Sequence, residues 1–103
     1  MLIYKVFRPA EWAELEAAGE TPGSPVDRAD GFVHFSTAEL LAGTLERHFA
    51  GEAGLVLLAV DADAVAADLR WEPSRGGALF PHLYRPLALA DILWSRPVAD
   101  GLP

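Results

Sequence analysis

The run of six apolar residues from Leu55 to Val60 constrains the fold of this chain more than any other segment. It lies between Gly54 and Asp61 and carries no polar side chain on either face. Because successive side chains of a strand point to opposite faces, a strand of this composition must be covered on both sides. The run therefore predicts a central strand with other elements packed above and below it.

Other short segments rich in β-branched and aromatic residues predict further strands. They are residues 2–7, 32–35, 69–72, 79–84 and 92–94. Proline cannot donate to a strand ladder, so Pro81 favours an edge strand or a bulge. In the 32–35 segment, period-two alternation places Phe32 and His34 on one face.

Two helices are expected early in the chain. Residues 9–18 predict the first, with a proline in its first turn and Gly19 at its end. Ser36-Thr37-Ala38-Glu39 matches a capping box and begins a second helix that Gly51 stops. The intervening residues 20–31 are rich in Pro, Gly and Asp and predict a long loop.

Residues 61–68 predict a short helical turn. With five or six strands and two or three helices in 103 residues, we expect one α+β domain spanning 1–103. A hydrophobic fraction of 51% excludes intrinsic disorder. The longest apolar run is far shorter than the roughly 20 residues of a membrane span. No signal peptide is expected after Met1, so the sequence predicts a cytoplasmic protein without membrane contact.

The formal charge of −7 argues against a nucleic acid polymer as partner, because phosphate binding needs a basic surface. The segment from Leu69 to Pro86 is different, since it holds three arginines and only one acid, Glu72. A locally cationic segment in an acidic protein is suited to a small anion.

Several common chemistries are excluded. The chain has no cysteine, and its three histidines lack the spacing of a metal site, so we expect no metal. No serine lies in a Gly-x-Ser-x-Gly elbow, and no glycine-rich phosphate loop is present. His48, at the end of a helix, is interpreted as complementing the helix dipole.

Two segments remain that carry polar chemistry. Residues 34–37 place an imidazole and two hydroxyls at the end of a strand, just before a helix. Residues 74–84 place Arg75 on a glycine-rich turn and then His82 and Tyr84 on one strand face. If the two segments lie on neighbouring strands, they line one cleft; the alternative for His34 is a core histidine bonded to backbone.

Taken together and in order, five blocks resemble the domain of unknown function 952 family over essentially the whole chain. The blocks are Asp30–Thr37, His48–Gly51, Leu55–Asp61, Leu69–Gly77 and Phe80–Tyr84. The resemblance implies a fold related to ADP-ribosyltransferases and RNA 2′-phosphotransferases. In that fold a split β-sheet core forms a cleft for NAD, ADP-ribose or a related nucleotide, and no further cofactor is required.

By this likeness His34 and Thr37 face a ribose or phosphate, Arg75 a phosphate, and Tyr84 a ring, with His82 at the rim. The implied ligand-binding residues are His34, Ser36, Thr37, Ser74, Arg75, His82 and Tyr84, and the catalytic candidates are His34, Glu72 and His82. The toxin-type enzymes use a late glutamate, whereas the only acids after Tyr84 are Asp91 and Asp100. Three hypotheses therefore stay open: an ADP-ribosyl-transfer enzyme, a non-enzymatic module for a nucleotide or small anion, and a structural interaction domain.

Overall fold

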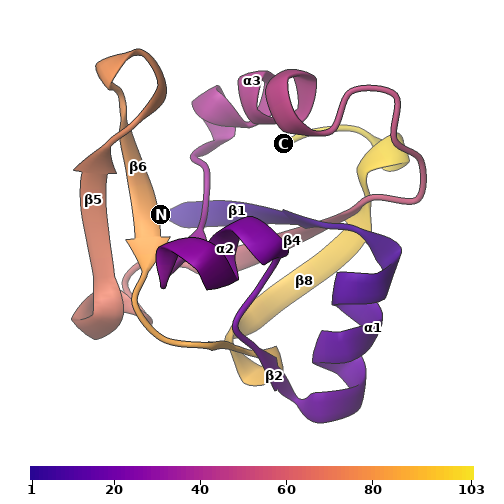
Figure 1. The fold of residues 1–103 in the computed structure, drawn as a ribbon, viewed down its shortest axis with the longest axis horizontal. Helices are drawn as coiled ribbons and strands as arrows, with labels where there is room; N and C mark the ends of the chain where they lie inside the picture. Colours follow the sequence, from indigo (N-terminus) through magenta and orange to yellow (C-terminus); the bar gives the residue numbers. More distant parts are fainter.

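The apolar run forms the centre of a three-stranded antiparallel sheet, as predicted. In the computed structural model, which describes residues 1–103, β4 (Val56–Asp61) lies between β1 (Leu2–Phe7) and β8 (Ile92–Pro97) (Figure 1). Ile3 pairs with Val60 and Phe7 with Val56 in the register of β1 with β4. Both ladders of β4 are filled, so its backbone groups are bonded on each side.

Two smaller antiparallel sheets complete a divided β core. One has the order β3-β6-β5 and the other pairs β2 with β7. Their bounds are β2 (Glu20–Thr21), β3 (Val33–His34), β5 (Leu69–Pro73), β6 (Leu79–Leu83) and β7 (Leu87–Ala88). A bridge between Tyr4 and Ser36, with two backbone bonds of 2.8 Å, joins the chain after β3 to β1. The segment that carries His34 is thereby fixed against the central sheet.

The helices are α1 (Pro9–Ala18), α2 (Pro25–Asp30) and α3 (Ala38–His48). Short 3₁₀ turns lie at Ala66–Asp68, Arg75–Gly77, Leu89–Asp91 and Val98–Asp100. The first helix has its predicted bounds, and Gly19 ends it in the left-handed conformation (φ 81°) that glycine adopts without strain. None of the helices has the length and apolar character needed to cross a bilayer.

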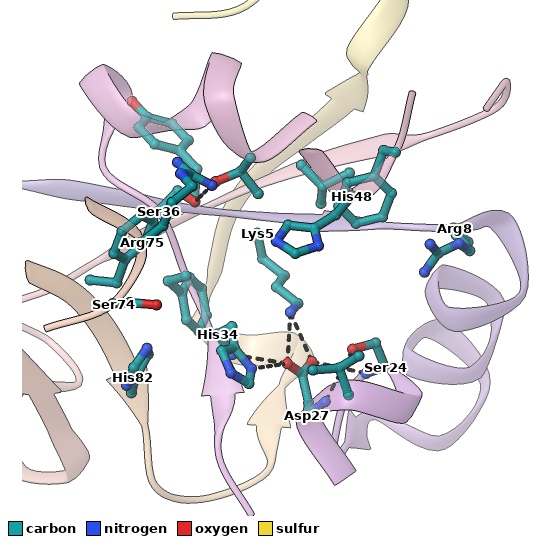
Figure 2. A pocket seen from close by; sticks show the side chains of 17 residues that line it. Lys5, Arg8, Ser24, Asp27, His34, Ser36, His48, Ser74, Arg75 and His82 are labelled. Atoms are coloured by element: carbon teal, nitrogen blue, oxygen red, sulfur yellow. Dashed lines mark hydrogen bonds and ion pairs between the residues drawn. The ribbon is translucent and has the colours of Figure 1, made fainter. Parts of the chain in front are cut away.

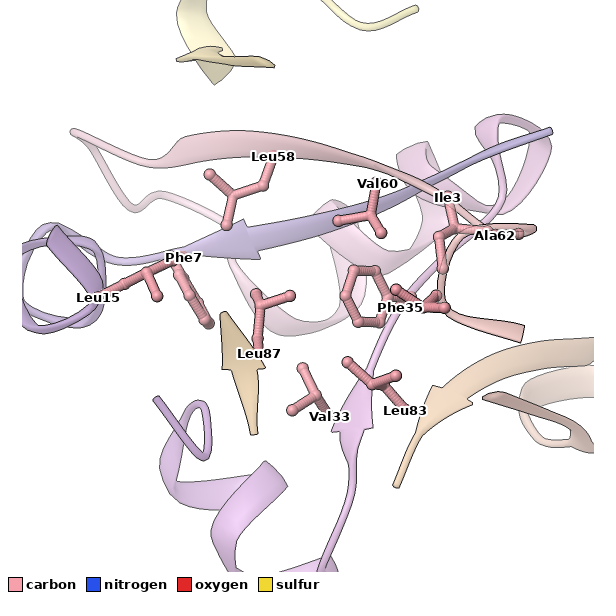
Figure 3. Close-up of a cluster of buried hydrophobic side chains, with 11 residues drawn as sticks. Ile3, Phe7, Leu15, Val33, Phe35, Leu58, Val60, Ala62, Leu83 and Leu87 are labelled. Atoms are coloured by element: carbon pink, nitrogen blue, oxygen red, sulfur yellow. The ribbon is translucent and has the colours of Figure 1, made fainter. Parts of the chain in front are cut away.

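The core lies on both faces of the central sheet. Helix α3 covers one face (Figure 1), and its Leu41 packs there with Tyr4, Val6, Leu57 and Ala59. The opposite face meets α1, β3, β6 and β7 (Figure 3). Its buried side chains are Ile3, Phe7, Leu15, Val33, Phe35, Leu58, Val60, Ala62, Val65, Leu83 and Leu87. Burial of each of these leucine side chains contributes about 1.5–3 kcal/mol to the free energy of unfolding. The α+β architecture predicted from the sequence is confirmed.

The long loop predicted over 20–31 is wrong, because this segment contains β2 and α2. Ser24 caps α2: its hydroxyl accepts from the Asp27 backbone N–H at 3.3 Å, and Asp27 accepts from the Ser24 N–H at 2.9 Å. Pro25 occupies the first helical turn and Gly31 ends the helix. The Pro, Gly and Asp residues that indicated a loop are therefore the start and stop signals of a short helix.

The capping box predicted at residues 36–39 does not form. Thr37 is the N-cap of α3 and makes no side-chain capping bond. Ser36 instead belongs to the bridge with Tyr4, and its hydroxyl lies 2.9 Å from Thr44 Oγ1. Pairing with β1 fixes Ser36 in an extended position, and α3 ends at His48, before Gly51.

The predicted edge position of Pro81 is also wrong, since β6 is the middle strand of its sheet. Pro81 pairs with Trp71 on β5, and its carbonyl accepts from the Phe35 N–H at 2.9 Å. The β3 strand ends at His34, one residue before this contact. A proline is tolerated because the β3 ladder does not continue past it.

Candidate functional site

A cavity of about 460 Å³ lies between β1, α2, β3, α3 and the turn before β6 (Figure 2). This volume is within the range of about 300–1,000 Å³ that small-molecule sites occupy. Five of the residues predicted to bind a ligand line it: His34, Ser36, Ser74, Arg75 and His82. The remaining three candidates, Thr37, Glu72 and Tyr84, do not line it.

The two polar segments meet because β3 and β6 are paired. His34 and His82 are direct register partners, and their ring centroids are 5.1 Å apart. Opposite residues of an antiparallel pair point to the same face, so strand pairing alone brings both imidazoles together. The site predicted from the sequence requires that segments 34–37 and 74–84 line one cleft. Both segments do line the same cavity, through five of the predicted ligand-binding residues.

Asp27 is the polar centre of the cavity wall and was not predicted. It is 1% exposed, and Lys5 Nζ lies 2.8 and 3.0 Å from its two carboxylate oxygens. Its Oδ1 also accepts from the His34 backbone N–H at 3.0 Å and lies 2.7 Å from His34 Nδ1 (Figure 2). Burial would raise the pKa of Asp27, but the hydrogen bonds from His34 and the charge of Lys5 outweigh it and hold the pKa well below its usual range.

Lys5 was missed because it lies within a strand whose other residues are apolar or aromatic. By strand alternation it points to the same side as Ile3 and Phe7. Burial lowers the pKa of Lys5, and the facing carboxylate of Asp27 partly offsets this. The only available signal was a lone cation in a predicted core strand, which requires a buried partner somewhere in the fold.

Two residues outside the cavity, Glu72 and Tyr84, form the hydrogen bonds that fix the Nδ1 side of His82. Its Nδ1 is 2.8 Å from Glu72 Oε1, and the Tyr84 hydroxyl donates to the same oxygen at 2.6 Å. The hydrogen bonds from Tyr84 and His82 lower the pKa of Glu72, and the bond to Glu72 raises the pKa of Tyr84. Tyr84 therefore contributes to the site through Glu72 and not as a stacking platform in the cavity.

Positive charge is in excess at the α3 side. Arg75 forms no ion pair; its Nη2 donates to the Leu40 carbonyl at 3.2 Å and its guanidinium lies 5.0 Å from the centroid of the Phe80 ring. Arg8, by contrast, is neutralised by Glu52 at 2.8 Å. The one carboxylate that lines the cavity, Asp27, is already bonded to Lys5 and His34. An uncompensated guanidinium in this position suits an anionic ligand.

Two residues of α3 shape this side of the cavity. A Cβ at Gly43 would lie 3.0 Å from Arg75 Nη2, so the absence of a side chain lets the guanidinium lie against the helix. His48 sits at the exposed rim; partial burial lowers its pKa, as do the positive charges of Arg47 and Arg75. No group of three or more His, Cys, Asp or Glu side chains is placed to hold a metal ion.

The comparisons with other proteins agree with this architecture. The family model described as "Protein of unknown function (DUF952)" matches residues 6–95. The chain belongs to the DUF952 family. This DUF952 protein is 49% identical to CC0527 from Caulobacter crescentus, whose crystal structure it matches with a TM-score of 0.91 over 100% of this chain and 93% of that chain.

The solution NMR structure of CC0527 matches with a TM-score of 0.83, 50% identity, and coverage of 99% of this chain and 90% of that chain. No curated protein matches this DUF952 chain significantly. The family expected from the five sequence blocks is thus confirmed.

Proposed function

We propose that this DUF952 protein binds a nucleotide of the NAD or ADP-ribose class in the cavity, with its phosphates beside Arg75. The observation that carries the proposal is the unpaired guanidinium in a cavity whose only carboxylate is already neutralised. The chain as a whole carries a formal charge of −7, so this local excess of positive charge is not a consequence of composition.

The rest of the lining suits the sugar and base of such a ligand. Ser36, Thr44 and His82 offer hydroxyl and imidazole groups for ribose hydroxyls, and Phe80 offers an apolar wall. The likeness of the strand around His34 to the ribose-positioning strand of ADP-ribosyltransferases and RNA 2′-phosphotransferases supports the same ligand class. A fold relationship to those enzymes is part of this proposal.

A second candidate function is ADP-ribosyl transfer, favoured by the carboxylate-bound His82 beside His34. Its mechanism would be positioning and electrostatic stabilisation of an oxocarbenium-like ribose. We favour binding without transfer because Glu72 lies behind His82, outside the cavity, and does not reach a ligand as a late glutamate would.

The test is a thermal-shift and calorimetric titration with ADP-ribose, NAD and inorganic pyrophosphate. A ligand at 100 times its Kd adds about 2.7 kcal/mol of stability, so binding raises Tm measurably. We expect the largest shift with ADP-ribose or NAD. Release of nicotinamide from NAD would establish an enzyme that cleaves the glycosidic bond, and a modified acceptor would establish transfer. No shift with any of the three would leave the structural interaction domain as the better description.

The affinity for ADP-ribose, whose esterified diphosphate keeps its charge between pH 7.5 and 5.5, should rise as pH falls below neutrality. Partial burial and the positive charges of Arg47 and Arg75 disfavour protonation of His48 in the free protein. A bound anion reverses this effect, so binding takes up a proton as pH falls through the lowered pKa of His48. Calorimetry between pH 7.5 and 5.5 should show the rise in wild type and a weaker one in His48→Gln; equal profiles would contradict the assignment.

Gly43→Ala should separate stability from binding. Alanine in place of glycine in a helix interior raises the free energy of unfolding by about 0.5–1 kcal/mol. The new Cβ would also displace the Arg75 guanidinium, which lies against Gly43. We expect a higher urea midpoint together with a several-fold loss of affinity for pyrophosphate. The matched control is Ala42→Gly at the exposed neighbouring position, which should lose stability and keep wild-type affinity.

A further inference from the structure

We infer that Glu72 and Tyr84 are positioning residues that hold His82 in its Nδ1–H tautomer, so that Nε2 accepts a hydrogen bond from a hydroxyl of the bound ligand. The inference deepens the proposed function and rests on it, since it assigns the contact with a sugar hydroxyl to His82 and not to His34. The ligand class is accordingly a sugar phosphate, with its hydroxyl on His82 and its phosphate at Arg75.

The first step is the shared oxygen. Glu72 Oε1 accepts from the Tyr84 hydroxyl at 2.6 Å and faces His82 Nδ1 at 2.8 Å. An ionised carboxylate has no proton to donate, so Nδ1 of His82 must carry the proton of this bond. The hydrogen bonds from Tyr84 and His82 lower the pKa of Glu72, which keeps the carboxylate ionised at neutral pH.

The second step is the fixed orientation of the ring. Phe32 stacks on the His82 ring at a centroid distance of 4.3 Å and an interplanar angle of 26°. Phe32 also packs on Tyr84 at 5.0 Å, and the Arg70 guanidinium lies 4.5 Å from the centroid of the Tyr84 ring. The stacking fixes the plane of the His82 ring, and a 180° flip within that plane would carry Nδ1 away from Glu72. The bond to Glu72 therefore sets which edge of the imidazole is directed away from Glu72.

The third step is the difference between the two histidines. In His34 both nitrogens lie near carboxylates, with Nδ1 2.7 Å from Asp27 and Nε2 3.0 Å from Asp30. His82 bonds to protein only through Nδ1, and it lines the cavity. Of these two paired histidines, only His82 therefore keeps a ring nitrogen free for a ligand, and as a neutral acceptor its Nε2 selects an O–H donor over a phosphate oxygen.

The test of the tautomer needs no ligand. Long-range ¹H–¹⁵N correlation spectra of the ¹⁵N-labelled protein at pH 8, where an ordinary histidine is neutral, distinguish protonated from unprotonated ring nitrogens. We expect His82 to show a protonated Nδ1 and a free Nε2 in wild type, and a mixture of tautomers in Glu72→Gln. Asp30→Asn, which removes a carboxylate beside the other histidine, should leave the His82 signals unchanged.

Glu72 is half-buried on the edge strand β5, so Glu72→Gln could fold poorly. In that case the more conservative variant Tyr84→Phe provides the same test. Without the Tyr84 hydroxyl, Glu72 loses one of the two donors that hold its Oε1 in place, so the His82 nitrogen signals should shift part of the way toward the mixed state. A protonated Nε2 in wild type, or a His82 spectrum that both variants leave unchanged, would overturn the inference whatever the protein binds.

The ligand experiment compares ADP-ribose with inorganic pyrophosphate, which carries no sugar hydroxyl, by calorimetry. The ratio of ADP-ribose affinity to pyrophosphate affinity should fall about tenfold in Glu72→Gln relative to wild type, the value of one hydrogen bond, while pyrophosphate affinity stays within about twofold. An unchanged ratio with intact binding would overturn the inference and leave the proposed function standing. Absence of binding to either probe would remove the proposed function and with it the ligand contact, and the spectra would still decide the positioning of His82.

Discussion

Replacing Asp27 by alanine should lower the free energy of unfolding by about 3–5 kcal/mol, because it leaves a buried charge without a partner. Lys5 is 7% exposed and its only carboxylate partner is Asp27. The same change removes the acceptor for the backbone N–H groups of Ser24 and His34. Urea unfolding followed by circular dichroism measures the loss.

Asp63→Ala is the matched control, since its side chain is 91% exposed and its removal should change stability by less than about 0.5 kcal/mol. Asp27→Asn keeps the shape of the side chain and removes only the charge, so it reports on the ion pair should Asp27→Ala fail to fold. Equal stabilities of Asp27→Ala and Asp63→Ala would show that the buried pair does not hold the fold together.

Asp27 also makes the free energy of unfolding depend on pH, and this free energy should fall as the pH falls. The pKa of Asp27 is lowered in the folded protein, so the unfolded chain binds more protons at acidic pH. The stability that this group contributes is fully present above its unfolded pKa of about 3.9 and is lost as pH falls toward the lowered folded value. Unfolding free energies measured from pH 6 down to pH 3 should therefore fall less steeply in Asp27→Asn than in wild type.

Arg75→Ala should weaken binding of ADP-ribose or pyrophosphate by about 10- to 100-fold, the range of one charge-assisted hydrogen bond, and remove the ligand-induced rise in Tm. Its guanidinium bonds only to the Leu40 carbonyl and packs on Phe80 at the cavity wall. Because no ion pair is broken, the Tm of the unliganded protein should change little. Calorimetry and thermal unfolding give the two quantities.

Arg47→Ala is the control for charge, since it removes the same charge from an exposed position of α3 that does not line the cavity. It should weaken binding much less than Arg75→Ala does. Equal losses in the two variants would assign the effect to the general field of α3. A large drop in the unliganded Tm of Arg75→Ala would give the arginine a structural role instead.

Local signals in the sequence were sufficient for several elements. The all-apolar run predicted the middle strand β4, and Pro9 and Gly19 predicted both ends of α1, because these patterns act within one element. The 20–31 segment was misinterpreted although Ser24, Pro25 and Asp27 form an ordinary helix start. Dense Pro, Gly and Asp residues indicate both loops and helix caps, and the contacts of Asp27 with Lys5 and His34, which fix this helix against β1 and β3, appear only in the tertiary structure.

The site divides in the same way. The sequence by itself determined which side chains carry chemistry and, through period-two alternation, that His82 and Tyr84 lie on one strand face. Only the tertiary structure decided that His34 lies opposite His82 and that Arg75 fits against Gly43. The same holds for the hydrogen bond from Tyr84 to Glu72 outside the cavity. The reason is that strand register and helix placement join residues distant in sequence, and these are set by burial of the whole core, which no local pattern encodes.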